Sequence, residues 1–418
     1  MPRRSKRQAE KEEEEAKKSK LSDGWKMSWE EAGGAKIKGV APLLVYDGED
    51  ALKSSVVAGF DMDGTIIKTK SGRRFPTGPS DWVFWDDAVI KKLRDLHSNN
   101  TKIVFFTNQA GIEKKNTSVS SITSKIEDIL ETLGFPVTVL VCTGHNHYRK
   151  PSIRLWEYFA EHCNDGGEID LQRSVFVGDA AGRSKDWKPG MKKDFSCTDR
   201  MFAANIGVPF HTPEEFFLDE PKATKYEWRA ADPGKLLAAS VSSPRDMSHI
   251  TKKAPPTEMI VLVGSPASGK STFAERHLKP HGYVIVNRDT LGTMAKCEKA
   301  AAKALEDGQS VVVDNTNPDP ASRAKFIQIA TKHSVPVRCV ELTTPRDVAS
   351  HLNYFRAILT DGKRRRIPDV AFNSFRSKYK APSAGEGFDE VIKVEFVPEF
   401  HGHNKTRARE LFAHWQSG

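Results

Sequence analysis

The chain has 418 residues and a formal net charge of +9, and 38% of its residues are apolar. This length and composition predict a folded protein of two to three domains, and they exclude a chain too polar to build a core. No apolar run is long enough to cross a membrane, so we expect no membrane partner. The five cysteines form no C-x-x-C pair, which indicates a reducing compartment and argues against structural zinc.

The first 22 residues are almost all charged or small, so we expect them to be disordered because they cannot build an apolar core. Two basic clusters, 2–7 and 17–20, flank an acidic stretch. This arrangement resembles a bipartite nuclear import signal and predicts a nuclear protein. The alternative is a solvated arm in which Glu and Lys side chains pair four residues apart.

After this tail, apolar runs typical of buried strands alternate with segments of helical periodicity, which predicts parallel sheets in an α/β fold. A stretch rich in Pro, Ser and Lys predicts a connector over residues 221–256. We therefore expect two domains, 35–220 and 257–418. The predicted strands are 43–46 (a lead-in strand), 56–58, 102–106, 138–142, 174–177, 259–263, 283–286 and 310–313.

Two helices of the first domain are marked by their ends. Asp87 is expected to cap a helix whose apolar residues recur at helical spacing. A second helical pattern covers residues 122–133 and is expected to stop at Gly134, because glycine is the common residue after a helix C-terminus.

Two aspartates, Asp61 and Asp63, follow the predicted strand 56–58. If the extended backbone lasts through Asp63, both side chains point to the same side, and Gly64 then lets the chain turn. A carboxylate can attack phosphorus, and a free Asp is ionised at neutral pH. Asp63 must start protonated if it is to protonate a leaving oxygen. A like charge nearby raises the pKa of a carboxyl group, so Asp61 favours the protonated form of this second Asp, while a bound cation would keep Asp61 ionised. The alternative is an ordinary turn rich in Asp and Gly.

Three further strand ends carry Thr107, Lys150 and Asp179 in that order. With the paired aspartates, this order resembles the haloacid-dehalogenase superfamily of phosphohydrolases. The resemblance implies that Asp61 is the nucleophile and Asp63 the acid/base, and that Thr107 and Lys150 hold the phosphoryl oxygens. It implies that Mg²⁺ lies between Asp61, Asp179 and the carbonyl of Asp63. Asp199 begins a later helical pattern and is either a second acid near the metal or a helix N-cap.

The predicted strand 259–263 is followed by G-x-x-x-x-G-K-[ST] over residues 264–271 and then by a helix, which predicts a nucleotide-binding P-loop. Its glycines let backbone N–H groups close around phosphate, and the helix N-terminus adds positive potential. Lys270 is expected to reach the β- and γ-phosphates of ATP, and Ser271 the Mg²⁺. The predicted nucleotide-binding residues are Gly264, Ser265, Ala267, Ser268, Gly269, Lys270, Ser271 and Thr272.

Two acids stand at the next strand ends of this domain. Asp314 can lie behind Mg²⁺, and Asp289 can take the proton from an acceptor hydroxyl. A motor-type ATPase would not need the second acid. Arg356 lies on a predicted helix before the basic cluster 363–366, so it can close over the γ-phosphate; the alternative for that cluster is a solvated loop.

A haloacid-dehalogenase phosphatase sheet followed by a P-loop kinase sheet is similar to the bifunctional polynucleotide kinase 3′-phosphatases. The segments 61–65, 178–183, 194–197 and 287–290 carry this resemblance. It implies repair of DNA strand breaks, with 3′-phosphate removed and 5′-hydroxyl phosphorylated from ATP. The partners that it implies are DNA strand ends, ATP, and a repair scaffold or ligase. It assigns Asp289 as the base and Arg356 as a lid residue.

Two other functions are compatible with parts of the sequence. One is a metabolic enzyme that acts on small sugars or nucleosides, which the basic charge and the tail disfavour. The other is a non-enzymatic scaffold for broken ends, which the competent residue type at every catalytic position disfavours. Vertebrate members of the family carry an N-terminal forkhead-associated domain, and here a charged tail stands before the first motif.

Overall fold

The computed structural model describes residues 27–48, 51–241, 247–251 and 257–416. The expectations for the tail of residues 1–22 lie outside this range. The chain forms two compact units, Met1–Arg229 (with Ser417–Gly418) and Ala230–Gln416, which are described separately below. Among the described residues, no helix combines the length and apolarity needed to cross a membrane.

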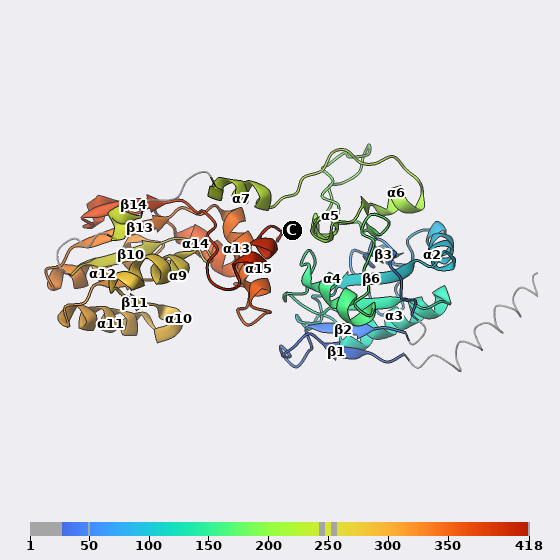
Figure 1. Ribbon diagram of the computed structural model, residues 1–418, viewed down its shortest axis with the longest axis horizontal. Helices are drawn as coiled ribbons and strands as arrows, with labels where there is room; N and C mark the ends of the chain where they lie inside the picture. The colour runs from blue at the N-terminus through green and yellow to red at the C-terminus, as the bar shows by residue number, and fades with distance from the viewer. Residues whose placement is uncertain (1–26, 49–50, 242–246, 252–256, 417–418) are drawn as a thin grey trace, which may run out of the picture. The chain divides into compact units, whose positions relative to one another are not determined.

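The first unit is built on a seven-stranded sheet in which the predicted strands occur (Figure 1). The five strands β7, β6, β3, β8 and β9 are parallel, as the α/β prediction requires. The lead-in strand also forms, but it pairs antiparallel with β7, and a further strand pairs antiparallel with it. In sheet order the strands are β1 (Glu30–Ala32), β2 (Leu43–Tyr46), β7 (Thr138–Cys142), β6 (Lys102–Asn108), β3 (Val57–Phe60), β8 (Val175–Val177) and β9 (Phe210–His211).

Helices and one hairpin surround this sheet. The helix α3 ends at Gly134 as predicted; this residue has φ = 74°, and its N–H donates to the carbonyl of Leu130. Asp87 occupies the N-cap position of α2 as predicted, but its side chain makes no capping hydrogen bond; the Ala88 N–H donates to Asp86 instead. The elements are the hairpin β4 (Ile67–Lys68) and β5 (Val83–Phe84), and α2 (Ala88–Ser98), α3 (Val119–Leu133), α4 (Arg154–Tyr158), η1 (Phe159–Cys163), α5 (Thr198–Ile206) and α6 (Pro213–Phe217).

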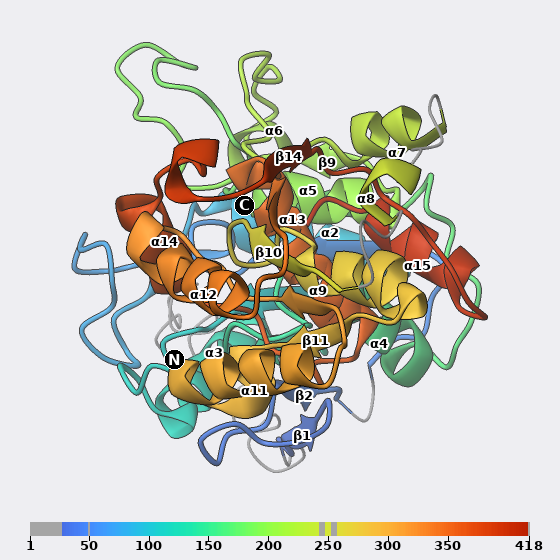
Figure 2. The same ribbon diagram turned by 90° about the vertical axis from the view of Figure 1, so that its left-hand side faces the viewer.

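The second unit has a five-stranded sheet in which every pair of neighbours is parallel (Figures 1 and 2). The central strand β10 alternates its side chains between two apolar cores. Val261 packs on one face with residues of α11 and α12, and Ile260 packs on the other with residues of α8 and α9. In sheet order the strands are β11 (Val284–Val286), β12 (Val311–Val313), β10 (Met259–Val263), β13 (Val337–Leu342) and β14 (Glu390–Val394).

The helices of the second unit begin within the predicted connector. The described residues of that stretch include the helices α7 and α8, and Ile250 of the second is fully buried in the core of this unit. Earlier in the stretch, Tyr226 bridges to Arg183 of the first unit. The helices are α7 (Pro233–Val241), α8 (Ser248–Thr251), α9 (Lys270–Phe273), η2 (Ala274–Leu278), η3 (Lys279–His281), α10 (Arg288–Leu291), α11 (Met294–Glu306), α12 (Pro320–Lys332), α13 (Arg346–Leu359), α14 (Asp369–Lys378), η4 (Ala384–Glu386) and α15 (Lys405–Phe412).

Candidate active sites

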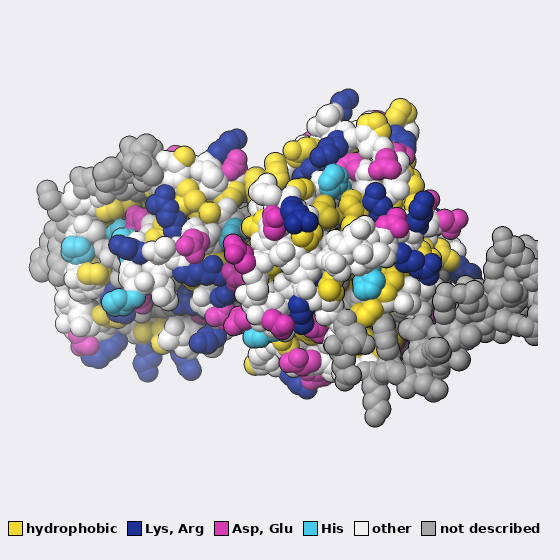
Figure 3. Space-filling view, turned by 45° about the vertical axis from the view of Figure 1, so that its right-hand side comes forward, with side chains coloured by type: hydrophobic (Ala, Val, Ile, Leu, Met, Phe, Trp, Pro, Cys, Tyr) yellow, Lys and Arg dark blue, Asp and Glu magenta, His cyan; other side chains and the backbone are white. Residues whose placement is uncertain are grey.

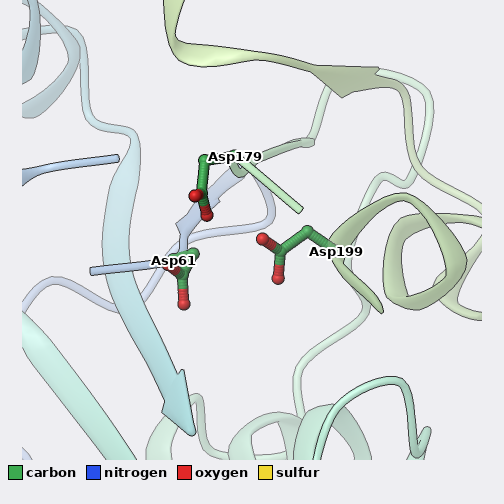
Figure 4. A group of neighbouring side chains, drawn as sticks. All are labelled: Asp61, Asp179 and Asp199. Carbon is green, nitrogen blue, oxygen red and sulfur yellow. The ribbon is translucent and has the colours of Figure 1, made fainter. Parts of the chain in front are cut away.

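Three carboxylates meet at the carboxyl end of the first sheet (Figure 4). Asp61 follows β3, and its N–H donates to the carbonyl of Val177 at the end of the neighbouring strand β8. This pairing brings Asp179, two residues after β8, beside Asp61. Asp199 enters from the first turn of α5. One carboxylate oxygen of each aspartate lies within 4.8 Å of the other two.

A buried lysine lies among these acids. The Lys150 Nζ is 2.6 Å from Asp61 Oδ1 and 2.7 Å from Asp199 Oδ1. Burial alone would lower the pKa of this ammonium, but the attraction of Asp199 and Asp61 outweighs it, so the pKa is raised. The predicted phosphate-holding lysine thus lies directly beside the predicted nucleophile.

The acid groups nevertheless outnumber their cation. Burial raises the pKa of Asp61 to about 7, with Lys150 opposing and Asp199 adding to this effect. Burial and the nearby charge of Asp61 also raise the pKa of Asp179 well above its usual range. A divalent cation would supply the missing positive charge, and oxygen-only donors are those that Mg²⁺ prefers. The side chains present therefore fit the predicted metal.

The carboxylates occupy space that a side chain would fill at two glycine positions. A Cβ atom at Gly64, which has φ = +85°, would lie 2.6 Å from Asp179 Oδ2. A Cβ atom at Gly178 would lie 2.5 Å from the Cβ of Asp199. Both glycines are therefore part of the site's shape.

The structure decides between the two alternatives for Asp199. The N-cap position of α5 is Cys197, and the Asp199 carboxylate does not cap its own helix. Instead, Asp199 Oδ2 accepts a hydrogen bond of 3.0 Å from the N–H of Ala180, in the loop after β8. The capping alternative is wrong, and Asp199 joins the acid cluster.

Asp63 lies beside this cluster but in a different environment. The strand β3 ends at Phe60, so the extended backbone does not last through Asp63 as the sequence argument assumed. The Asp63 side chain is half-exposed, and its two oxygens accept from Gln109 Nε2 at 2.6 Å and from Lys125 Nζ at 3.1 Å. The same Gln109 amide donates to Thr107 Oγ1 at 2.8 Å, which links the predicted Thr107 to Asp63.

Sequence reasoning missed both partners of Asp63. Gln109 directly follows β6, so the strand-end pattern that found Thr107 extends to it. Lys125 lies three residues after Ile122, on the apolar face of α3. A lysine on an apolar face was the available signal, because a buried ammonium requires an acidic partner.

The second unit forms the predicted P-loop between β10 and α9. Gly269 has φ = +99°, and Lys270 begins the helix. The Lys270 Nζ donates to the backbone carbonyls of Gly264 at 2.9 Å and Ser265 at 2.7 Å. Burial lowers the pKa of Lys270 to about 8. Ser271 and Thr272 are exposed at the mouth of the loop.

Most of the predicted kinase residues line one pocket of about 830 Å³, although Gly264 and Ser265 do not. Lys270, Ser271, Asp289, Asp314 and Arg356 are all on its wall. The size suits a nucleotide and part of a second substrate.

Asn287, to which the sequence argument gave no role, joins the two acids of this pocket. Its amide donates to Asp314 Oδ2 at 2.6 Å, and its Oδ1 accepts from the backbone N–H of Asp289 at 2.7 Å. On α13, Arg356 donates to the carbonyl of Arg365 at 2.9 Å. Burial and the neighbouring Arg364 lower the pKa of Arg356.

The two sites have the side chains expected of a phosphatase and of a P-loop kinase. Comparison with known proteins agrees. The family model described as polynucleotide kinase 3 phosphatase matches residues 56–217, and the model of an AAA domain matches residues 259–298 and 292–382.

Two relatives match most of the chain, and a third matches part of it. A bifunctional polynucleotide phosphatase/kinase of Schizosaccharomyces pombe is 40% identical over 344 residues, 82% of this chain and 80% of that protein. A protein of Acanthamoeba polyphaga mimivirus is 34% identical over 364 residues, which span 81% of this chain and 84% of that protein. The polynucleotide 3′-phosphatase of Saccharomyces cerevisiae is 29% identical over 214 residues, which span 38% of this chain and 87% of that enzyme. The chain belongs to the family of bifunctional polynucleotide phosphatase/kinases.

Proposed function

We propose that the protein prepares DNA strand ends for joining, by removing a 3′-phosphate in the first unit and phosphorylating a 5′-hydroxyl from ATP in the second. The observation that carries this proposal is one chain with an aspartate–lysine phosphatase site and a P-loop pocket that holds a second acid. Family membership excludes the non-enzymatic scaffold as the main function.

In the phosphatase reaction, Asp61 attacks the phosphorus of the 3′-phosphate, and the bond from phosphorus to the 3′-oxygen breaks. Asp63 gives its proton to the departing oxygen. A water molecule then attacks the aspartyl phosphate, Asp63 takes the proton of that water, and inorganic phosphate leaves. Lys150 contacts the nucleophile, and Thr107 is linked to Asp63 through Gln109. Their donors would suit the phosphoryl oxygens.

We also propose Mg²⁺ as the cofactor of both sites. In the first unit Asp61, Asp179, Asp199 and the carbonyl of Asp63 would hold it. In the second unit Ser271 and Asp314 would hold it with the phosphates of ATP. When bound, the ion supplies positive charge to the phosphoryl group that is transferred.

In the kinase reaction, Asp289 accepts the proton of the 5′-hydroxyl as that oxygen attacks the γ-phosphorus. The bond from the γ-phosphorus to the bridging oxygen breaks, and ADP leaves. Lys270 would move from the carbonyls of Gly264 and Ser265 to the phosphates, and Arg356 would approach the γ-phosphoryl group.

An exposed aromatic pair supports a polynucleotide rather than a small metabolite. Phe75 and Phe195 are 73% and 84% exposed. The Arg74 guanidinium lies 5.4 Å from the first ring centroid and 4.9 Å from the second. Aromatic rings and Arg planes stack on nucleic-acid bases. On the face in Figure 3, Lys and Arg are interspersed with Asp and Glu. A single-sign charged surface does not cover that face, so stacking on the exposed aromatic pair would help to hold the strand.

The test is a duplex with a nick that bears 3′-phosphate and 5′-hydroxyl, incubated with ATP and Mg²⁺. We expect both ends to change, with Lys270→Ala losing only the 5′ reaction.

The salt dependence of binding distinguishes a polynucleotide substrate from a small metabolite. Neutralising about five phosphates of a single strand gives a slope near −3.5 in log K against log[salt]. Raising salt from about 50 to 200 mM should then weaken oligonucleotide binding about a hundredfold. A nucleoside 3′-monophosphate should lose far less, and equal kcat/KM for the two substrates at low salt would favour the metabolic enzyme.

We further propose that the tail directs the protein to the nucleus and that a repair scaffold or ligase receives its products. The two basic clusters of residues 1–20 support the first proposal. The second follows from chemistry, because 3′-hydroxyl and 5′-phosphate are the ends that a ligase joins. Deleting residues 1–20 should shift the protein to the cytoplasm and leave both activities intact, and unchanged nuclear enrichment would contradict the import role.

A further inference from the structure

The proposed acid/base, Asp63, is held at both of its oxygens. Gln109 donates to Oδ2 at 2.6 Å, and Lys125 donates to Oδ1 at 3.1 Å. The two donors come from different elements, one directly after β6 and the other in the middle of α3. Together they fix the plane and the direction of the carboxyl group, although half of its side-chain surface remains open.

Lys125 is the less expected of the two donors. Only 3% of its side chain is exposed, and it lies on the face of α3 that buries Ile122, Ile126 and Ile129. Within the described part of the chain, its one ion pair is with Asp63. Burying an ammonium costs free energy, so stability alone would favour a leucine here. The burial of this lysine therefore indicates that it has a function in the site.

The two reactive aspartates have separate buried lysines. Lys150 contacts Asp61 and Asp199, while Lys125 contacts Asp63. A carboxylate that attacks phosphorus and a carboxyl that moves a proton need different surroundings. Separate lysines allow the surroundings of each aspartate to differ.

We propose that Lys125 and Gln109 are positioning residues for the proton transfers that Asp63 performs. They direct the Asp63 carboxyl at the oxygen that leaves in the first half-reaction and at the attacking water in the second. The Lys125 ammonium also pairs with the carboxylate that remains once the proton has moved to the leaving oxygen. This inference rests on the proposed phosphatase function of the same site.

The test uses the full-length protein with Lys125→Met and two substrates that differ in their need for a proton. The 3′-oxygen of an oligonucleotide leaves as an alkoxide unless it is protonated, whereas p-nitrophenyl phosphate has an aryl leaving group that departs unprotonated. We expect the variant to lose about a hundredfold in kcat on the oligonucleotide, within the range of acid/base catalysis.

With p-nitrophenyl phosphate, the same variant should phosphorylate Asp61 within about threefold of the wild-type rate, because this step needs little acid. Hydrolysis of the aspartyl phosphate still needs Asp63 as a base. The variant should therefore show a burst of p-nitrophenol approaching one per enzyme, followed by slow turnover. A structural role for Lys125 would slow phosphorylation by both substrates and give no burst.

Controls separate the possible failures. Lys91→Met, on the exposed side of α2, should behave as wild type, and the thermal unfolding of each preparation, compared with that of the wild type, reports the folding of the first unit. Lys125→Gln keeps a donor without the charge and serves if the Met variant does not fold. Unchanged oligonucleotide turnover in folded variants, or equal losses in the rate at which the two substrates phosphorylate Asp61, would overturn the positioning role. A wild-type protein that left the oligonucleotide 3′-phosphate intact would instead refute the proposed function, and the burst experiment would still test Lys125.

Discussion

The two active sites of this chain have opposite electrostatic needs. In the first unit, Asp61, Asp179 and Asp199 share one lysine, so the site is short of positive charge. In the second unit, Lys270 lines the pocket beside the P-loop, and its ammonium donates to two backbone carbonyls and not to a carboxylate. Both units handle a phosphoryl group at the carboxyl ends of parallel strands.

This contrast shows how one sheet geometry supports two chemistries. In the proposed mechanism, a site whose own carboxylate attacks phosphorus gathers acids and needs a cation. A site in which one substrate attacks another would instead supply amides, Lys and Arg, and keep its acid for the proton. The two sites should therefore respond differently to substitution, pH and metal.

The largest expected effect is that of Asp61→Asn, since an amide does not attack phosphorus. We expect 3′-phosphatase activity to fall at least about a thousandfold and the kinase rate to stay unchanged, because the P-loop belongs to a separate core. Release of phosphate from a 3′-phosphorylated oligonucleotide measures the first, and transfer of labelled γ-phosphate the second. Lys270→Ala is the matched reverse variant. A normal phosphatase rate in Asp61→Asn would reject the nucleophile.

Asp289→Ala should separate proton transfer from nucleotide binding in the second unit. We expect the transfer rate to fall about a thousandfold, within the range for a lost general base, while ATP affinity stays within about threefold. Isothermal titration with ATP and single-turnover transfer provide the two measurements. The exposed Asp307→Ala is the control. Loss of ATP affinity with normal transfer by the bound fraction would make Asp289 a binding residue.

Acid should destabilise the second unit through His351. This residue is fully buried against Phe412, and burial lowers its pKa to about 4. Between pH 6.5 and 4 the unfolded chain binds the extra proton, so stability falls as the pH is lowered; the full shift corresponds to about 3 kcal/mol. Hydrogen exchange of peptides from β10 between pH 6.5 and 4 measures the stability of the second unit. His351→Leu should flatten the dependence, and an unchanged slope would exclude His351 as its source.

Metal removal should give the first unit the opposite pH dependence. The pKa of Asp61 is raised to about 7, so between pH 4 and 7 the folded state holds more protons and metal-free stability falls as pH rises. Mg²⁺ at about a hundred times its Kd contributes about 2.7 kcal/mol. We expect the gain in Tm from Mg²⁺ over EDTA to be larger at pH 7.5 than at pH 5.5. Asp61→Asn should weaken this difference, and an equal gain at both pH values would contradict the site.

The smallest effect concerns the exposed aromatic pair of the first unit. Phe195→Ala should lower kcat/KM for a 3′-phosphorylated oligonucleotide about tenfold, because stacking on one base contributes about 1–3 kcal/mol. A nucleoside 3′-monophosphate, which lacks neighbouring bases, should be less affected. The exposed Leu218→Ala is the control. Equal losses on the two substrates would show that Phe195 acts on the site and not on the strand.

Sequence alone was enough to predict the position of the residues near strand ends. Asp61 and Asp179 closely follow β3 and β8, Thr107 lies near the end of β6, and Lys150 follows β7 after a loop. Parallel strands bring these ends to one edge of the sheet. The direction of the lead-in strand β2 could not be read, because an apolar run looks the same in a parallel and an antiparallel pair. For this reason the sheet is mixed where a parallel one was expected.

Contacts that depend on long-range folding were beyond the sequence argument. Lys125 meets an acid 62 residues earlier in the chain, and nothing local marks that partner. Asp199 reaches the acid cluster because the loop after β8 folds back, with the Asp199 N–H donating to the carbonyl of Ala180. An Asp at a helix start is typical both of a helix cap and of a metal site. Only the path of the loop after β8 could therefore decide between the two interpretations of Asp199.

The glycine at position 178 limits which sequences this fold can accept. Its φ lies outside the left-handed region, so its backbone conformation alone would admit other residues. The obstacle is spatial, since even an alanine methyl group would overlap Asp199. Alanine at 178 would displace the Asp199 carboxylate, whereas a shorter residue at 199 would relieve the crowding but remove the acid from the cluster. Sequences that keep this aspartate can vary the surrounding loops, but they must keep the glycine with it.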